Sequence, residues 1–414
     1  MSLTFRQNIL MTTTLAAVAG CGDAVQPASA DLPEHTAHPA RARLEQLVRT
    51  STPGIQYVVL DSSRVLFEFN GGWADIANRR PMDSATTMMA YSMSKTITAA
   101  AVLQLVEAGK LDLDAPVSRY LPTQPYGSAI TIRQVIAHTA GIPNPIPLRW
   151  VHLASSHASF DGDAALASVL REHGKAKAEP GQKYAYANIG YWLLERVVER
   201  VSGEPFAGYV TRRILQPIAA QPAELGYAIP DPVRHARGYL EKYSLPNMLK
   251  GFLIDDAFIG DYEDGWLRIE SHFLNSPGMG GLVGTSRGFG KFLQDQLRGH
   301  SVILGDAGRR QFFEQQRTAT GTPIDMTLGW HIGSLDGARY FYKEGGGGGF
   351  HSMMRLYPDA GIASVMIVNA TTMNVGKALD DADRAILTKP SEHVTGDGRV
   401  PGSPTLRRAA TRSG

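Results

Sequence analysis

The chain has 414 residues, of which 43% are hydrophobic, so it can bury the core of one large domain or of two ordinary ones. Lysine and arginine total 41 against 39 aspartate and glutamate, which gives a formal charge of +2. This balance lacks the basic field of a nucleic-acid-binding surface, and no apolar run is long enough to span a membrane. We therefore predict a soluble globular body without a nucleic-acid partner.

The start of the chain is typical of an export signal, with an early positive charge and a moderately apolar stretch that ends in small residues. The letters VAGC, which end at Cys21, resemble the lipobox of bacterial lipoproteins, whose cysteine is acylated. Cys21 is the only cysteine, so no internal disulfide can form. We predict a lipoprotein-type signal peptide at 1–21 and a flexible tether at 22–40. The alternatives are an ordinary signal cut after Ala30 and a buried thiol.

This interpretation places the protein in the bacterial cell envelope, attached to a membrane through a lipid anchor on Cys21. Gly22 rather than aspartate follows the cysteine. By analogy with lipoprotein sorting, that favours the outer membrane, with the protein facing the periplasm.

Strand patterns occur near both ends of the chain. The segments "GIQYVVL" and "VLFEF", separated by the polar turn 61–64, predict a β-hairpin. Near the other end, "ARYFYK", "FHSMMRLY" and "IASVMIVN" predict three more strands with turn residues between them.

The middle of the chain is predicted to be helical. The segment "TITAAAVLQLVEAG", ending at Gly109, is apolar on almost every face, which is typical of a fully buried helix. A second helix, "GYWLLERVVERVSG", ends at Gly203. This order predicts a mixed α+β fold: an antiparallel sheet formed by both chain ends, flanked by helices, with an inserted all-α domain. The main domain, 41–385, is divided into a sheet part (41–90 and 276–385) and a helical part (91–275), with a disordered tail at 386–414.

The stretch "YSMSK" introduces the first helix and contains Ser92 and Lys95. Residues three apart on a helix lie on one face, so the hydroxyl and the amine point into the same space. A serine is a weak nucleophile until a base takes its proton, and lysine serves as that base when burial or the helix dipole destabilises its ammonium form. Taken alone, the pair is weak evidence, because chance S-x-x-K matches are expected in a chain of this length, and a helix-capping serine followed by a solvated lysine is then the favoured alternative.

Two further motifs give the pair its context: Tyr186-Ala187-Asn188 before the second helix, and Lys343-Glu344-Gly345 at the start of a glycine run. The set and its order resemble the serine β-lactamase and penicillin-binding protein superfamily, with its S-x-x-K, Y-x-N and K-T-G elements. The closest resemblance is to the class C β-lactamase branch and its esterase and D-aminopeptidase relatives. It extends over roughly residues 40 to 385, and includes "ITIRQVIAHTAGIP" and "GMGGLVGTSRGFGKFLQ".

The resemblance implies a role for each motif residue. Ser92 would be the acylated nucleophile and Lys95 its proton partner. Tyr186 would relay a proton to the leaving group and activate water, with its pKa lowered by the ammonium groups of Lys95 and Lys343. Asn188, Lys343, Glu344 and Gly345 would bind substrate, and the backbone N–H groups of Ser92 and Gly346 would form the oxyanion hole. The alternatives are a packed aromatic at Tyr186, a helix-entry residue at Asn188 and a solvated strand-end charge at Lys343.

Three histidines stand near these motifs. We interpret His138, in "HTAGIP", as structural, whereas His331 and His351 either border the cleft or act as packing residues. No metal-binding pattern is present, and we predict no cofactor.

The chain departs from K-T-G at Glu344, where the superfamily has threonine. If the carboxylate faces the cleft, it repels a substrate carboxylate and shifts specificity away from β-lactams. Strand alternation would instead turn it outward. The run of five glycines from Gly345 also predicts a mobile strand end, which suits varied esters.

The leading hypothesis is a lipid-anchored serine hydrolase that cleaves small ester or amide substrates, with carboxylesterase-like activity favoured. One alternative is a β-lactamase, or a D-amino-acid peptidase or carboxypeptidase acting on cell-wall peptides. Another is a non-catalytic envelope protein for binding or sensing. The oligomeric state is left open.

Overall fold

The computed structural model describes residues 39–145 and 150–387. The signal peptide with Cys21, the tether up to residue 38 and the tail beyond Leu387 lie outside the described residues. Within those ranges, no helix combines the length and the apolar composition needed to cross a membrane.

Both ends of the chain build one antiparallel sheet, as predicted. In β1 and β15, Ile55 pairs with Val368 and Leu60 with Ala363, so the first strand lies beside the last. The predicted hairpin joins β1 to β2, and Asp61 closes its turn by accepting hydrogen bonds from the backbone N–H groups of Ser63 and Arg64. The strands, in their spatial order, are β12 (His331–Leu335), β13 (Ala338–Gly347), β14 (Phe350–Tyr357), β15 (Ile362–Val368), β1 (Gly54–Leu60), β2 (Val65–Asp75) and β3 (Arg80–Pro81).

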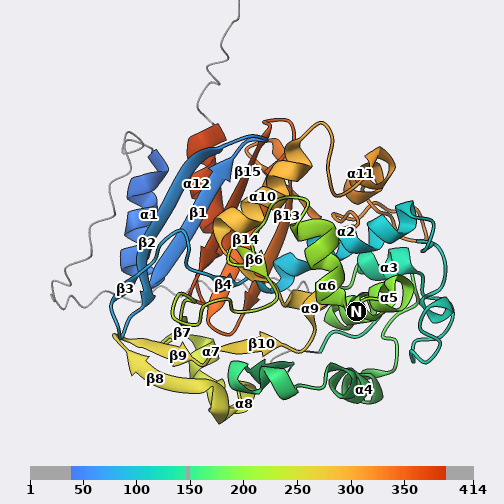
Figure 1. The fold of residues 1–414 in the computed structure, drawn as a ribbon, viewed down its shortest axis with the longest axis horizontal. Coiled ribbons are helices and arrows are strands. Elements are labelled where there is room, and N and C mark those ends of the chain that lie inside the picture. The colour runs from blue at the N-terminus through green and yellow to red at the C-terminus, as the bar shows by residue number, and fades with distance from the viewer. Residues whose placement is uncertain (1–38, 146–149, 388–414) are drawn as a thin grey trace, which may run out of the picture.

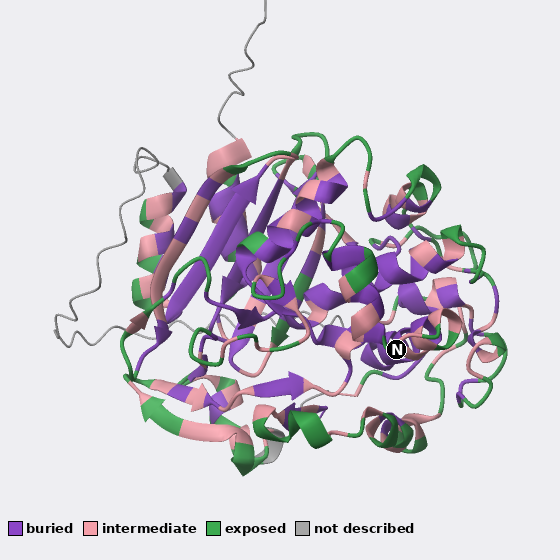
Figure 2. Cartoon of the chain, viewed as in Figure 1, coloured by how far each residue is buried: buried purple, intermediate pink, exposed green. Residues whose placement is uncertain are grey.

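The sheet is covered on both faces (Figure 1), which explains why every residue of β1 is buried (Figure 2). On one face, Tyr57 and Val59 pack with α1 (Pro39–Thr50) and α12 (Val375–Leu387). On the other face, Val58 joins the main core beneath α10 (Ser286–Leu297). Alternate residues of a strand point to opposite faces, so one apolar strand serves both cores.

Two buried helices beside the sheet carry the motif residues. Helix α2 (Ser94–Glu107) is buried along almost its whole length, which confirms the prediction from its all-round apolar sequence. Helix α5 (Asn188–Ser202) packs against α2 and ends at Gly203, whose φ of 76° is left-handed. The remaining helices are α3 (Ile132–Ile136), α4 (Gly162–His173), α6 (Phe206–Val210), α7 (Leu245–Met248), α8 (Lys250–Leu253), α9 (Pro277–Gly280) and α11 (Asp306–Phe313).

The middle segment contains strands as well as helices, so the inserted part is not all-α as predicted. A small sheet is built from β7 (Gly238–Glu241), β9 (Trp266–Ile269) and β8 (Ile259–Glu263). The hairpin between β8 and β9 turns at Asp264 and Gly265, both with positive φ (44° and 84°), as a two-residue hairpin turn requires. Further short strands are β4 (Met88–Met89), β5 (Val151–Leu153), β6 (Leu225–Gly226), β10 (His272–Leu274) and β11 (Val283–Gly284).

Candidate active site

The nucleophile candidate lies directly before α2. Ser92 is the middle residue of the 3-10 turn Tyr91–Met93, and Lys95 follows in the first turn of α2. The Lys95 Nζ lies 2.9 Å from the Ser92 Oγ, so the two motif residues meet as their spacing predicts. Lys95 is fully buried, while Ser92 lines a pocket.

Burial determines the protonation of Lys95. Removal from water, with a smaller contribution from the charge of Lys343, holds the pKa of Lys95 well below its usual value. Its Nζ donates a hydrogen bond of 2.5 Å to the carbonyl of Met279. A neutral amine held in this way can direct its lone pair toward the hydroxyl of Ser92, which is what a general base needs.

Tyr186 completes a hydrogen-bonded group of three. Its hydroxyl donates to the Ser92 Oγ over 2.9 Å, and the Nζ of Lys95 lies 5.3 Å from the centre of its ring. The expected lowering of its pKa is wrong: burial raises the pKa of Tyr186 well above its usual value, against the hydrogen bond with Ser92. The prediction treated Lys95 and Lys343 as cations, whereas burial disfavours the charged forms of all three groups.

Lys343, on β13, also lies against the ring of Tyr186. Its Nζ is 5.1 Å from the centre of the Tyr186 ring, is fully buried, and has no hydrogen-bond partner among the described residues. Burial lowers the pKa of Lys343 to about 7, although the charge of Glu344 acts in the opposite direction. The alternative of a solvated strand-end charge is therefore wrong, because Lys343 is buried at the site.

The glycines after Lys343 allow β13 to pass close to the nucleophile. A Cβ on Gly345 would lie 2.1 Å from the carbonyl oxygen of Ala90 and 2.8 Å from the backbone nitrogen of Ser92, so only glycine fits. Gly346 and Ser92 line the same pocket, where their N–H groups were predicted to form the oxyanion hole. The strand continues to Gly347, which pairs with Phe350, so the first three of the five glycines lie in a paired strand. The expected mobility of the strand end stays a prediction.

The structure corrects the expectation that Glu344 binds substrate. Its carboxylate lies 2.6 Å from the Nε2 of His351, and its side chain is 46% exposed. In the register of β13 and β14, Glu344 pairs with Met353, a residue of the core beneath α12, whereas Lys343 pairs with Met354 of the main core. Because side chains alternate along a strand, Glu344 points to the opposite face of the sheet from Lys343. Its negative charge still acts at the site by helping to raise the pKa of Tyr186.

The three histidines lie in different places. His138 supports the Tyr186 motif: its Nδ1 accepts a hydrogen bond from the backbone N–H of Ala187, and its ring centre lies 4.3 Å from that of Tyr186. The Nε2 of His331 lies 2.9 Å from the hydroxyl of Tyr184, at the Tyr186 side of the cleft. His351 contacts Glu344 and the carbonyl of Met373.

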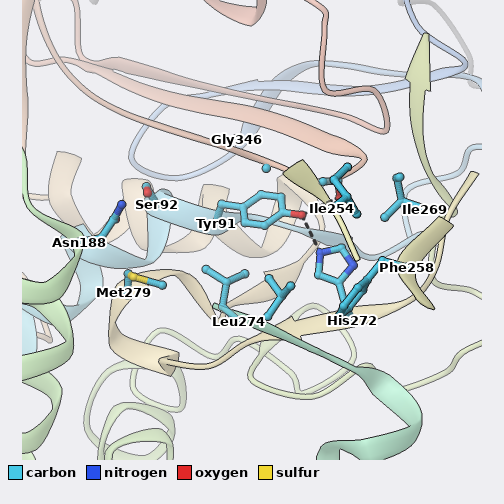
Figure 3. Close-up of a pocket in the computed structure, with 13 residues that line it drawn as sticks. Tyr91, Ser92, Asn188, Ile254, Phe258, Ile269, His272, Leu274, Met279 and Gly346 are labelled. Atoms are coloured by element: carbon cyan, nitrogen blue, oxygen red, sulfur yellow. Dashed lines mark hydrogen bonds between the residues drawn. The ribbon is translucent and has the colours of Figure 1, made fainter. Parts of the chain in front are cut away.

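A largely apolar pocket of about 200 Å³ opens beside Ser92 (Figure 3). Asn188, the first residue of α5, and Met279 stand near the nucleophile, with Leu274 beyond them. No carboxylate, ammonium or guanidinium group belongs to the described residues that line it. The complete lining is Tyr91, Ser92, Val151, Asn188, Ile254, Phe258, Ile269, His272, Leu274, Met279, Gly346, Gly347 and Gly348.

Most of the residues that line this pocket were not predicted from the sequence. Tyr91, directly before the nucleophile, has a left-handed φ of 47°, and its hydroxyl donates to the carbonyl of Gly348 over 2.7 Å. The same hydroxyl lies 3.0 Å from the Nε2 of His272 (Figure 3). Ile254 and Phe258 come from the middle segment. None of these residues belongs to a recognisable motif, so only the folded chain shows that they share a pocket with Ser92.

Comparisons with known proteins agree with this geometry. A family model described as Beta-lactamase matches residues 40–389. Penicillin-binding protein 4* of Bacillus subtilis (strain 168) is 25% identical over 340 residues, covering 80% of this chain and 69% of that protein. Protein flp of Staphylococcus aureus (strain MW2) is 25% identical over 349 residues, covering 81% and 63%. The chain thus spans about two thirds of the length of these two relatives. The D-amino acid amidase from Ochrobactrum anthropi SV3, complexed with L-phenylalanine amide, has a similar fold, with a TM-score of 0.71, 21% identity and coverage of 84% and 98%.

Proposed function

The chain belongs to the Beta-lactamase family of serine hydrolases, and on that premise we propose that it hydrolyses small uncharged esters with an apolar acyl group through an acyl-enzyme on Ser92. The observation that carries the proposal is a largely apolar pocket at the Ser92 hydroxyl, beside the hydrogen-bonded Lys95 and Tyr186. None of the described residues that line it is an aspartate, glutamate, lysine or arginine.

The first half of the reaction forms the acyl-enzyme. The Ser92 Oγ attacks the substrate carbonyl carbon while its proton passes to the neutral amine of Lys95. The carbonyl oxygen becomes negative and is stabilised by the backbone N–H groups of Ser92 and Gly346. When the bond to the leaving group breaks, the leaving oxygen takes a proton from the Tyr186 hydroxyl, and the Lys95 ammonium restores the proton of Tyr186. The alcohol departs, and Ser92 carries the acyl group.

In the second half of the reaction, water hydrolyses the acyl-enzyme, and Tyr186 and Lys95 exchange protons in the opposite order. A water molecule gives its proton to the Tyr186–Lys95 pair as its oxygen attacks the acyl carbon. The proton returns to the Ser92 oxygen when the ester to the enzyme breaks, releasing the carboxylic acid. The free enzyme is thereby restored, with no net change in its protons.

The pocket is assigned to the acyl part of the substrate. A leaving group has to lie near its proton donor, and Tyr186 does not line the pocket. The space on the pocket side of Ser92 therefore receives the acyl group. The described residues of its walls offer no charged partner for the ammonium group of an amino acid or for a carboxylate, and leaving a charge unpaired beside them costs several kcal/mol.

Esters are favoured over amides because of the acidity of Tyr186. An amine leaves only after its nitrogen has been protonated, and burial makes Tyr186 a weak acid by raising its pKa. An alcohol, and above all a phenol, is a better leaving group. The charge of Glu344 does not support this preference, because its side chain does not point into the pocket.

A substrate series tests the proposal. With p-nitrophenol as the constant leaving group, kcat/KM should rise about tenfold from acetate to butyrate, as two buried methylenes would give. D-phenylalanine amide, a D-Ala-D-Ala peptide and a penicillin should react much more slowly than the best ester. Ser92→Ala is the control for non-enzymatic hydrolysis. Faster turnover of the D-amino acid amide, the peptide or the penicillin would overturn the ester assignment in favour of the amidase, peptidase or β-lactamase alternative.

The location of the enzyme is a separate proposal that rests on the sequence alone. We propose that Cys21 is acylated and anchors the chain to the outer membrane, facing the periplasm. Cell fractionation of wild type and Cys21→Ser tests it. Equal recovery of the two proteins in the membrane fraction would contradict the anchor.

A further inference from the structure

Exposed apolar side chains are concentrated in one segment of the middle region. Nine large hydrophobic residues are exposed in the described part of the chain, and five of them fall between residues 243 and 262. We call these five the 243–262 surface. They are Tyr243 (83% exposed), Leu245 (43%), Met248 (74%), Leu249 (40%) and Tyr262 (48%). Scattered exposed apolar residues are ordinary, but a local group of this kind marks a contact surface.

The helical turn α7 is inverted with respect to an ordinary surface helix. Its polar residue Asn247 is only 1% exposed, whereas Leu245 and Met248 face outward. Asn247 is fixed by hydrogen bonds: its Nδ2 donates to the carbonyl of Glu241 over 3.1 Å, and its Oδ1 accepts from Tyr262 over 3.0 Å. A polar anchor inside and an apolar face outside indicate that this turn is held ready for a non-aqueous surface.

Two lysines frame the apolar face. The Nζ of Lys242 lies 5.5 Å from the ring centre of Tyr243 and 5.8 Å from that of Tyr262, and the Nζ of Lys250 is 5.6 Å from the Tyr262 ring. The ammonium groups are thus held against the tyrosine rings by cation–π contacts, and that of Lys250 also donates a hydrogen bond to the Tyr262 hydroxyl. Tyrosine and lysine in this arrangement are typical of the boundary between lipid and water.

The same segment also forms the wall of the pocket beside Ser92. Ile254 and Phe258, which follow α8, line that pocket (Figure 3), and Ile254 packs on the small core that includes Ile269, itself a lining residue. Strands β8 and β9 and helix α8 lie together along one edge of the molecule (Figure 1). The 243–262 surface therefore belongs to the element that encloses the proposed acyl site.

We propose that the 243–262 surface docks onto a zwitterionic or uncharged lipid surface, from which apolar ester substrates reach the pocket at Ser92. The docking itself rests on the exposed residues and the inverted turn, and the delivery of substrate rests on the proposed function. The exposed carboxylates of Asp255, Asp256 and Asp261 in this segment outnumber Lys242 and Lys250, so a strongly anionic membrane is disfavoured. A second copy of the chain is the weaker alternative, since five side chains fall far short of the roughly 20–30 residues per partner in a stable interface.

The test uses the full chain with Cys21→Ser, so that a lipid anchor cannot contribute. Binding to phosphatidylcholine vesicles is measured by co-sedimentation for this protein and for the same protein carrying Tyr243→Ser and Met248→Ser. The matched control carries Val302→Ser, which removes a 55% exposed apolar side chain outside the segment. Turnover of soluble p-nitrophenyl acetate and labelling of Ser92 by a fluorophosphonate are recorded for all three.

We expect the double variant to bind vesicles at least about tenfold more weakly, as the loss of two buried apolar side chains implies. Val302→Ser should bind as its parent does, and acetate turnover should be unchanged in all three. Hydrolysis of a long-chain ester presented in the vesicles should fall together with binding. Equal binding by the double variant, tighter binding to phosphatidylglycerol vesicles than to phosphatidylcholine, or a dimer abolished by the two substitutions would overturn the proposal. Vesicle binding without hydrolysis of any ester would leave the docking surface standing and overturn the proposed function.

Discussion

The amine of Lys95 lies 2.9 Å from the hydroxyl oxygen of Ser92, and burial disfavours its protonation. The Ser92 hydroxyl is therefore in contact with an amine that is free to accept its proton. Lys95→Arg should lower kcat by a factor on the order of 10³ or more, because a guanidinium cannot be deprotonated in this role. Steady-state kinetics on p-nitrophenyl butyrate, with circular dichroism to establish folding, provides the measurement. Near-normal activity of a folded Lys95→Arg protein would move the base to another residue.

Ser92 and Ser94 offer a matched pair of serines for testing the nucleophile. The hydroxyl of Ser94 is fully buried and accepts a hydrogen bond from the backbone N–H of Leu282, so it is not available for attack. Ser92→Ala should lose both turnover and labelling by a fluorophosphonate, whereas Ser94→Ala should keep its labelling and lose stability. Intact-mass spectrometry after labelling distinguishes them. A labelled Ser92→Ala protein would contradict the assignment.

The charge of Lys343 should be visible in the pH profile. In its ammonium form, Lys343 lowers the pKa of Lys95. Lys343→Met removes that charge, so the pKa of Lys95 rises and the acid limb of kcat/KM moves to higher pH. The variant should fold, because the Nζ that it removes has no hydrogen-bond partner among the described residues. Lys110→Met, at an exposed position, is the control and should leave the limb in place. A shift to lower pH would mean that Lys343 does not act on the base through its charge.

The sheet could be predicted because its strands carry their own signals. The strands at both ends of the chain have apolar runs bounded by turn residues, and burial on both faces requires such runs. The meeting of Ser92 with Lys95 followed from helical spacing, whereas the arrival of Tyr186 and Lys343 was implied by the family resemblance. The small sheet has a signal too, since Asp264-Gly265 is a strong hairpin dipeptide.

The rest of the site depends on tertiary structure. His272, on β10, and Phe258, in the 3-10 turn Asp256–Phe258, reach the pocket from far along the chain, and no spacing in the sequence relates them to Ser92. The protonation of Tyr186 was predicted with the wrong sign because a motif names the charged neighbours but not the burial of all the groups together. In the same way, only the register of β13 and β14 shows which way Glu344 points.

The register of β13 and β14 determines what we expect of Glu344→Thr. Its half-exposed carboxylate pairs with His351 on the face opposite to Lys343, so the substitution should not favour anionic substrates over neutral ones. Loss of the charge lowers the pKa of Tyr186 and should change kcat/KM for both substrates by the same factor, about threefold or less, as for other exposed charges. The measurement compares a penicillin with p-nitrophenyl butyrate on both proteins. A selective gain of tenfold or more for the penicillin would place the carboxylate in the cleft.

The last prediction concerns Glu195, a buried carboxyl group that holds the backbone segment in contact with Lys95. It is 2% exposed and accepts hydrogen bonds from the Ser276 hydroxyl over 2.6 Å and from the Gly278 N–H over 2.8 Å. The next residue, Met279, supplies the carbonyl that holds the Nζ of Lys95. Burial raises the pKa of Glu195 from 4.5 to about 7, despite the two hydrogen bonds.

The pKa of Glu195 is higher in the folded protein than in the unfolded chain. Between these two pKa values, the folded protein therefore keeps the Glu195 proton, whereas the unfolded chain has released it. The contribution of Glu195 to stability is therefore fully present below pH 4.5 and is lost as the pH rises to about 7, a change of about 3 kcal/mol in the free energy of unfolding. Glu195→Gln keeps an acceptor for Ser276 and removes the titration. Relative to wild type, it should gain stability between pH 4.5 and pH 7.5, as measured by urea unfolding at both values. Glu172→Gln, at an exposed position, should show no such gain. A wild-type protein that becomes more stable relative to Glu195→Gln as the pH rises would show that Glu195 is held as a carboxylate, and the raised pKa would then be wrong.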